Sequence, residues 1–233
     1  MDLRGSIPVF FDMTSGKVSD VCFLDTIEFE RGAFYVMDRG YIDYGRLHKI
    51  HNTGAFFVTR TKTNSRIKRR YSNPADKTTG VICDQIVFFT GRKSAEKYPD
   101  TIRRVKYYDK ETDKIYAFFT NNFDISALSI SLLYKHRWQI ELFFKWIKQH
   151  LKIKTFWGYS ENAVKTQICI ALCVYLIVAI LKKRFKFSQN LYEILQILSI
   201  SLFDKSGLNE LSSRSDLQKL DDDNKKTLSL FDF

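Results

Sequence analysis

The stretch Ala33–Thr59, AFYVMDRGYIDYGRLHKIHNTGAFFVT, decides the fold class of this chain. Its apolar run Ala33–Met37 is typical of a buried strand, and it stops at the polar sequence DRG. Tyr44–Thr53 then predicts a helix that ends at Gly54, and Ala55–Thr59 predicts a second buried strand. A strand, a helix and a strand joined by short links indicate an α/β layer with parallel pairing.

The sequence on both sides of this stretch predicts further elements. Ile7–Met13 is expected to form a strand and Ser19–Ile27 a short helix. From Lys62 to Thr120, short β-rich runs alternate with turn clusters and show no helical period, which predicts an all-β insertion. Three helical patterns follow, over Ser126–Lys152, Ser160–Lys186 and Leu191–Phe203. The expected division is residues 1–62, 63–120, 121–187 and 188–233, the last ending in a polar tail.

The charge of the chain favours a polyanionic partner. Its 37 basic and 26 acidic residues leave a formal net charge of +11 and a pI near 9.4. Nucleic acid and an anionic membrane surface both suit this excess, and a cationic protein with no such partner suits it equally well. The longest apolar run, Ile168–Leu181, is shorter than the roughly 20 residues that span a bilayer. It therefore predicts a buried core helix and no membrane span.

The start of the chain and its cysteines favour a reducing compartment. The opening residues are polar, unlike a secretory signal, and no two cysteines form a metal-type Cys-x-x-Cys pair. We therefore expect the protein in the cytoplasm.

The first long helical pattern carries a polar stripe that we expect to be exposed. At about 100° per residue, Tyr134, Arg137, Glu141 and Lys148 fall near one another, with the apolar face around Phe144 packed on a core. Three more residues lie close to this stripe: Trp138, Lys145 and Lys152. Surface ion pairs four residues apart explain part of this pattern. Cations and aromatic rings around one acid also suit phosphate contacts and base stacking.

The spacing Tyr134-x2-Arg137-x3-Glu141-x6-Lys148 resembles the Y-R-E-K signature of bacterial DDE transposases, those of the insertion sequence four family. The sequences RWQIELFFKWIKQHLKIK and SENAVKTQI also resemble this family, and the likeness extends from about residue 7 to residue 186. The resemblance implies a ribonuclease H-like α/β core, similar to that of retroviral integrases, with an inserted β subdomain and C-terminal helices.

The resemblance also implies metal-dependent cleavage and strand transfer of insertion-sequence DNA ends. In such enzymes, Asp, Asp and Glu hold two divalent metals, here Mg²⁺ or Mn²⁺, which stabilise the attacking and leaving oxygens. Glu141 matches the Glu of this triad and Asp38 its second Asp, so both are expected to be catalytic metal ligands. Asp43 lies nearby, but its place before Tyr44–Thr53 favours a helix cap.

The expected partners are transposon ends, target DNA and a second copy of the chain in a homodimer. By resemblance, Tyr134, Arg137 and Lys148 contact phosphates at the transposon end, and Lys145, Lys152 and Arg39 are added to these DNA contacts. A basic run without acids predicts a further electrostatic contact, although a solvated hairpin explains it as well. Its members are Arg60, Lys62, Arg66, Lys68, Arg69 and Arg70.

The sequence departs from the family at the first Asp of the triad. Residues 1–6 resemble the end of a hairpin that follows the first strand, so we expect that strand and its Asp to be missing. Asp12 and Asp2 are poor substitutes by position. Two of three carboxylates should bind metal poorly, which predicts a truncated transposase that is inactive alone.

Two alternatives belong to other functional classes. One is a non-catalytic regulator that binds DNA or pairs with a full-length transposase and poisons it. The other, a cationic membrane-surface protein, is weaker, because the basic residues are mixed with carboxylates and aromatics and do not form one amphipathic anchor.

Overall fold

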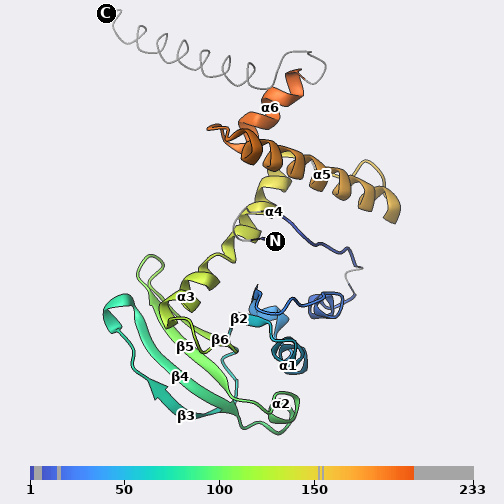
Figure 1. The fold of residues 1–233 in the computed structure, drawn as a ribbon. Coiled ribbons are helices and arrows are strands. Elements are labelled where there is room, and N and C mark those ends of the chain that lie inside the picture. Colours follow the sequence, from blue (N-terminus) through green and yellow to red (C-terminus); the bar gives the residue numbers. More distant parts are fainter. Residues whose placement is uncertain (3–6, 15–16, 152, 154, 202–233) are drawn as a thin grey trace, which may run out of the picture. The chain divides into compact units, whose positions relative to one another are not determined.

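The computed structural model describes the chain except residues 3–6, 15–16, 152, 154 and 202–233 (Figure 1). Contacts within the chain divide it into two units. Residues 10–141 form the sheet unit, and residues 1–9 with 142–233 form the helical unit. The domain boundaries expected at residues 62, 120 and 187 stay a prediction. The predicted polar tail lies outside the described residues.

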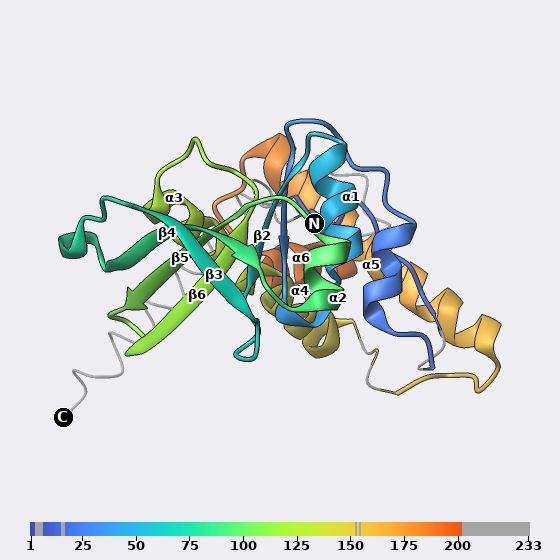
Figure 2. The same cartoon turned by 90° about the horizontal axis from the view of Figure 1, so that it is seen from below.

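The sheet unit is built on one six-stranded sheet with the order β1-β2-β6-β5-β4-β3 (Figure 2). Strand β1 (Phe34–Met37) pairs in parallel with β2 (Phe56–Arg60), and helix α1 (Tyr44–Asn52) connects them. The predicted strand, helix and parallel strand are therefore confirmed. Asp43 caps α1 as expected, because its carboxylate accepts the backbone N–H of Arg46 at 3.0 Å.

The predicted β-rich segment extends this same sheet. Its strands are antiparallel and join the sheet where β6 pairs with β2. They are β3 (Ile67–Asn73), β4 (Val81–Phe89), β5 (Ile102–Asp109) and β6 (Lys114–Thr120). The expectation of an all-β segment is wrong at α2 (Arg92–Lys97) and at the 3-10 helix η3 (Lys77–Thr79). Both are too short to show a helical period in the sequence.

The sheet buries apolar side chains on both faces. Successive residues of a strand point to opposite faces, so Phe57 and Phe119 join one core while Val58 and Phe118 join the other. Helices α1 and α2 cover the first core, and α3 (Ala127–Lys135) covers the second (Figure 1). Each fully buried side chain of this size stabilises the fold by about 1.5–3 kcal/mol.

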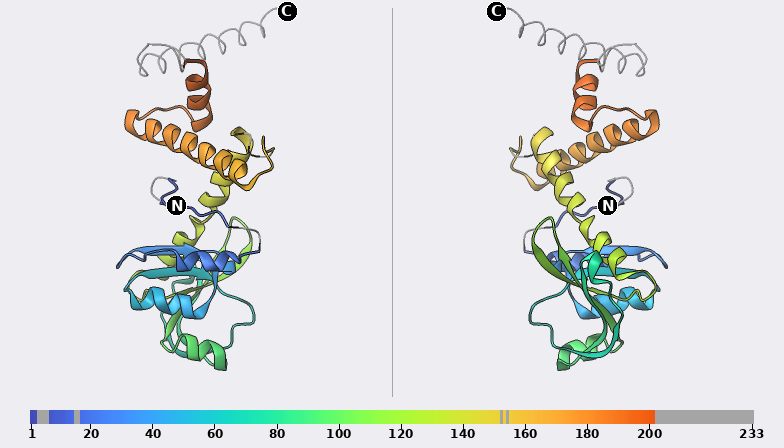
Figure 3. Two further views of the ribbon diagram at one scale, coloured as in Figure 1. Left: turned by 90° about the vertical axis from the view of Figure 1, so that its right-hand side faces the viewer. Right: turned by 90° about the vertical axis from the view of Figure 1, so that its left-hand side faces the viewer.

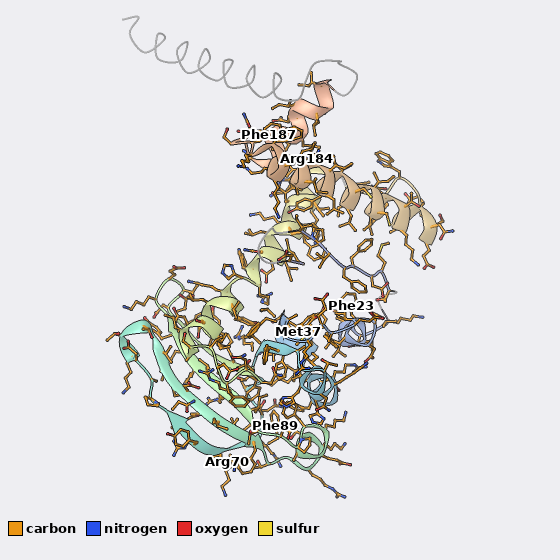
Figure 4. The ribbon with its side chains drawn as sticks, viewed as in Figure 1. Phe23, Met37, Arg70, Phe89, Arg184 and Phe187 are labelled. Atoms are coloured by element: carbon orange, nitrogen blue, oxygen red, sulfur yellow. The ribbon has the colours of Figure 1, made fainter. Side chains whose placement is uncertain are left out.

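Strand β4 contributes to the first core. Its last residue is Phe89 (Figure 4). The ring centroid of Phe89 lies 4.4 Å from that of Tyr44 in α1. The outermost strands differ in character. Strand β1 is a short apolar edge among the described strands, whereas β3 at the other edge is mostly exposed.

The long helix expected over residues 126–152 is two helices. Helix α3 ends at Lys135 and α4 (Trp138–His150) begins three residues later. Between them, the backbone N–H of Arg137 donates to Tyr134 and that of Ile140 donates to Arg137, at 3.0 and 3.1 Å. Such bonds to the third preceding residue tighten the helix, so one angular step per residue cannot be carried across this turn.

The turn changes which residues of the first long pattern are buried. Tyr134, expected on the exposed stripe, is only 8% exposed. On α4 the buried residues are Phe143 and Ile147, whereas Phe144 is 51% exposed. The predicted faces are therefore wrong at Tyr134 and Phe144, because they assume a single uninterrupted helix, whereas the apolar position of Ile147 is confirmed.

Among its described residues, the helical unit holds two further helices close to their predicted positions, α5 (Glu161–Phe185) and α6 (Leu191–Ser201) (Figure 3). Ser160 caps α5, and its hydroxyl accepts the backbone N–H of Ala163 at 3.2 Å. The rings of Phe143 on α4 and Tyr175 on α5 meet edge to face, with centroids 4.8 Å apart.

Helix α5 is not the buried core helix that its apolar run predicts. Ile170, Ile177 and Ile180 are each more than half exposed. The run is part of a 25-residue helix that is long and apolar enough to cross a membrane, and 28% of the apolar stretch is buried. Apolar side chains lie on all sides of α5, but the described residues that pack against it cover one side, so the apolar side chains on the other side stay exposed.

Two expectations near the start of the chain also differ from the structure. The strand predicted over residues 7–13 is absent from the described residues, where Ile7 makes one isolated bridge with Asp2. Phe10 and Phe11 are close to half exposed. An apolar run alone does not make a strand without a neighbour to pair with. The predicted short helix is the 3-10 helix η1 (Asp20–Asp25).

Candidate functional site

The carboxyl ends of β1 and β2 place Asp38 and Arg60 at one edge of the sheet. Met37 lies opposite Thr59 in the parallel register, so the residues that follow them, Asp38 and Arg60, lie at the same end of the parallel pair. The hydroxyl of Thr59 donates to the backbone carbonyl of Asp38 at 3.4 Å. Crevices at the carboxyl ends of parallel strands are common ligand sites, which makes this edge the candidate site.

The Asp38 carboxylate is held by two donors. The backbone N–H of Arg39 donates to its Oδ1 at 2.7 Å, and the phenol of Tyr134 donates to the same atom at 3.3 Å. Burial raises the pKa of Tyr134 above its ordinary value, so its hydroxyl keeps its proton at neutral pH. Tyr134, expected to contact a phosphate, thus contacts a carboxylate here.

Arg137 lies in the turn between α3 and α4 and joins the same region. Its Nη1 is 2.8 Å from Oε1 of Glu141, and its guanidinium carbon is 5.6 Å from the centre of the Tyr134 ring. Burial is the largest single influence and would lower the pKa of Arg137, but the hydrogen bond to Glu141 and the nearby charges, among them Asp38, together raise it above its ordinary value. Its Nε is buried, and no group in the described part of the chain accepts its hydrogen bond.

These residues surround an open hollow of about 710 Å³, called the cationic hollow below. It is lined by Asp38, Arg39, Gly40, Arg60, Lys62, Thr63, Asn64 and Arg137. Four of these side chains are cationic and one is acidic. The hollow therefore suits an anion with several acceptor oxygens, such as a phosphate group.

Two of the cations are positioned by neighbouring groups. The guanidinium carbon of Arg60 lies 5.1 Å from the centre of the Tyr116 ring. The Lys62 ammonium donates to the backbone carbonyl of Ile42 at 3.2 Å. The sequence grouped both residues with the basic run of the β segment, whereas the structure places them beside Asp38. Parallel pairing of the two strands was the signal that could have located them.

The rest of the basic run lies on or next to β3. Lys68, Arg69 and Arg70 are exposed on this edge strand, and Arg66 is exposed just before it (Figure 4). Charged side chains on an edge strand also hinder pairing with other chains, so their presence alone does not establish DNA binding.

The remaining residues of the predicted stripe belong to α4 or follow it. Lys145 and Lys148 are exposed in the helical unit, and Lys152 lies outside the described residues. Trp138, at the start of α4, is 56% exposed. The structure thus brings Asp38, Arg39, Tyr134 and Arg137 together, with Glu141 paired to Arg137.

The described residues do not form a complete site for divalent metals. They contain no group of three or more His, Cys, Asp or Glu side chains that could hold a metal ion. Asp38 is engaged by Tyr134 and Glu141 by Arg137. Two carboxylates among several cations favour an anion over Mg²⁺, which takes oxygen ligands in a near-octahedral arrangement.

Comparison with known proteins gives one consistent answer. The family described as "Transposase DDE domain" matches residues 1–177. The chain is 34% identical over 207 residues to a protein of Sinorhizobium fredii named as the transposase y4zB. It is 31% identical over 157 residues to one of Geobacillus stearothermophilus named as a transposase for insertion sequence element IS5377. A protein of Synechocystis, named as a transposase for insertion sequence element IS4SA, is 31% identical over 149 residues.

These relatives are longer than this chain. The matches cover 88%, 66% and 63% of this chain, but 58%, 41% and 40% of the respective relatives. The chain thus spans about half the length of the curated relatives it matches. Since the family match covers most of its length, the chain belongs to the DDE-domain transposases of insertion sequences.

Proposed function

We propose that this chain binds the DNA of insertion-sequence ends and seats a backbone phosphate in the cationic hollow. The proposal rests on the hollow itself, where four cationic side chains lie beside the Asp38 carboxylate at the carboxyl ends of two parallel strands. Arginine presents paired N–H donors that match phosphate oxygens. The buried Nε of Arg137 is a donor that such an oxygen would satisfy.

We assign Asp38 and Glu141 as two carboxylates of the transposition site, within a ribonuclease H-like core. The family generally uses divalent metal ions, and with a third acidic ligand these two would hold Mg²⁺ or Mn²⁺. The bound metals would stabilise charge on the attacking and leaving oxygens. This chain's own role would be to orient the phosphate with Arg137 and to keep the Asp38 carboxylate in place through Tyr134.

We expect more distant phosphates to meet the other basic residues. These are Lys145, Lys148 and Lys152 after the turn, and Arg66, Lys68, Arg69 and Arg70 at the β3 edge. A longer DNA footprint, including target DNA, would use these residues, and a homodimer would engage two ends. The proposed setting is the bacterial cytoplasm, at the nucleoid.

Salt-dependent binding to fluorescein-labelled duplex DNA tests the hollow. The double variant Arg60→Gln/Lys62→Gln is compared with Lys110→Gln/Lys114→Gln, which removes the same charge from two exposed lysines at the β5–β6 turn that have no proposed DNA contact. Each lost phosphate contact lowers the slope of log affinity against log salt by about 0.9. For the variant of the cationic hollow, we expect this slope to fall by about twice that amount. Its affinity for DNA at low salt should fall at least tenfold. Equal losses of DNA affinity in both variants would show that only net charge matters and would refute the cationic hollow as a phosphate site.

Metal-dependent cleavage is a separate test. We expect the chain alone to leave duplex DNA intact with Mg²⁺ or Mn²⁺, because the described residues provide two carboxylates and no third. Cleavage that vanished in Asp38→Asn would show that the chain completes its own metal site.

A second function, regulation without catalysis, is favoured by the same acidic residues. Glu141 is ion-paired with Arg137, and the metal site is incomplete in the described residues. Such a chain would bind DNA ends, or pair with an active transposase, and lower the frequency of transposition. Inhibition in a bacterial transposition assay should then survive Glu141→Ala, whereas an enzymatic contribution should not.

A further inference from the structure

Three aromatic side chains stand in solvent on the loop between α4 and α5. Trp157 is 84% exposed and Tyr159 is fully exposed, while Phe156 is 37% exposed. Across the described residues, no other ring lies against Trp157 or Tyr159. A single exposed apolar side chain is ordinary, but several aromatic side chains exposed on one loop indicate a binding surface.

The backbone of this loop is fixed to α5. The side-chain amide of Gln167 accepts the backbone N–H of Trp157 at 3.0 Å and donates to the carbonyl of Thr155 at 3.0 Å. Gly158 lies so close to α5 that a Cβ atom on it would be 2.7 Å from the Cβ of Ala163. The exposed indole is therefore carried by a backbone that is hydrogen-bonded to α5 at Thr155 and Trp157 and lies close to α5 at Gly158.

The sequence that leads into the loop is strongly basic. Residues 145–154 contain four lysines and no acid. Lys145 and Lys148 are exposed on α4, in the same unit as the loop. Cations followed by exposed aromatic rings are the combination that binds single-stranded nucleic acid, with the lysines on the backbone and the rings on the bases.

We propose that Trp157, assisted by Tyr159, stacks on unpaired bases of the bound DNA. The inference rests on the proposed DNA-binding function and adds a preference for a frayed or single-stranded end. Bases inside a duplex are already stacked, so only unpaired bases offer a free face to the indole. A membrane surface and a protein partner would also cover aromatic rings, but neither needs a flat π-face at this position.

Affinity for two DNA probes tests this preference. One probe is a blunt duplex, and the other is the same duplex with a single-stranded overhang. We expect the overhang to bind the native chain more tightly, and Trp157→Leu to remove about tenfold of that affinity. Trp157→Phe should keep most of it, since it retains a ring. Leucine keeps an apolar side chain, so it separates stacking from plain hydrophobic contact.

Fluorescence of Trp157 gives a second readout. The chain has three tryptophans, and Trp138→Phe with Trp146→Phe leaves Trp157 as the one reporter. Its emission should be quenched by the overhang probe more than by the blunt duplex, and not by phosphatidylglycerol vesicles.

The outcomes separate this inference from the function on which it rests. If the native chain does not bind duplex DNA, the proposed DNA-binding function itself is refuted. Intact duplex binding with no overhang preference, or equal behaviour of the Leu and Phe variants, would end only the stacking. Quenching of Trp157 fluorescence by vesicles at equal salt would refute stacking on bases and would instead indicate that the aromatic loop binds a membrane surface.

Discussion

The buried ion pair between Asp84 and Arg103 should be one of the most sensitive points of the sheet unit. Their side chains are only 6% and 5% exposed, and Arg103 makes two hydrogen bonds to the carboxylate, at 2.9 and 2.8 Å. Its Nη1 also donates to the backbone carbonyls of Asn122 and Ile125. The pair thus joins β4 and β5 to the segment that leads into α3.

We predict that Asp84→Ala lowers the free energy of unfolding by about 3–5 kcal/mol, because it leaves a buried guanidinium without its counter-charge. For a chain of this size that corresponds to a fall in Tm of about 6–20 °C. The double variant Asp84→Leu/Arg103→Met removes both charges and should recover much of this loss. Some loss should remain, since two carbonyl contacts disappear at about 1 kcal/mol each.

Urea unfolding followed by circular dichroism measures these differences. Arg104→Met is the matched control, since the adjacent Arg104 bonds Gln85 at 3.0 Å in a less buried position and should cost less than about 1 kcal/mol. A cost of Asp84→Ala no larger than that of this control, or a double variant less stable than Asp84→Ala, would refute the assigned role of the ion pair.

Three other perturbations have defined outcomes. Burial, and then the charge of Asp100, raise the pKa of Tyr98 above its ordinary value, so the folded state keeps a proton that the unfolded state loses above about pH 10. Stability should therefore fall as pH rises past 10, and a urea series at several pH values should show a flatter fall in Tyr98→Phe. Gly80→Ala should destabilise the fold by about 1–3 kcal/mol in thermal unfolding, because φ is +91° and the new Cβ would lie 2.7 Å from a backbone oxygen. Asp43→Ala should cost about 1 kcal/mol by the same assay through loss of the α1 cap, and Asp43→Asn should restore most of it.

Local sequence patterns predicted the elements whose signals lie within a few residues. Gly54, with a φ of +74°, ends the region of α1 as expected, and Asp43 and Ser160 cap their helices. The run before Asp38 predicted β1, and the run after Gly54 predicted its parallel partner. The hydrogen bonds of the two helix caps are made by neighbours in sequence, and the two strands are recognisable from their own apolar runs.

Features that depend on distant contacts could not be read in this way. The turn at Arg137 contains no glycine or proline, so the helical pattern appeared continuous. Tyr134 is buried by Phe118, which is distant in sequence, and its bond to Asp38 joins residues 96 positions apart. The site of Arg60 depended on strand order rather than on composition.

The apolar edge of β1 has a practical consequence for the isolated chain. Among the described strands, β1 has a neighbour on one side, so the main chain of Phe34–Met37 keeps donors and acceptors on the other. Unlike β3, this edge carries no lysine or arginine to repel a second strand. Association of purified protein should therefore begin there, grow with concentration, and respond to a lysine introduced at Tyr35 more than to one at Tyr71.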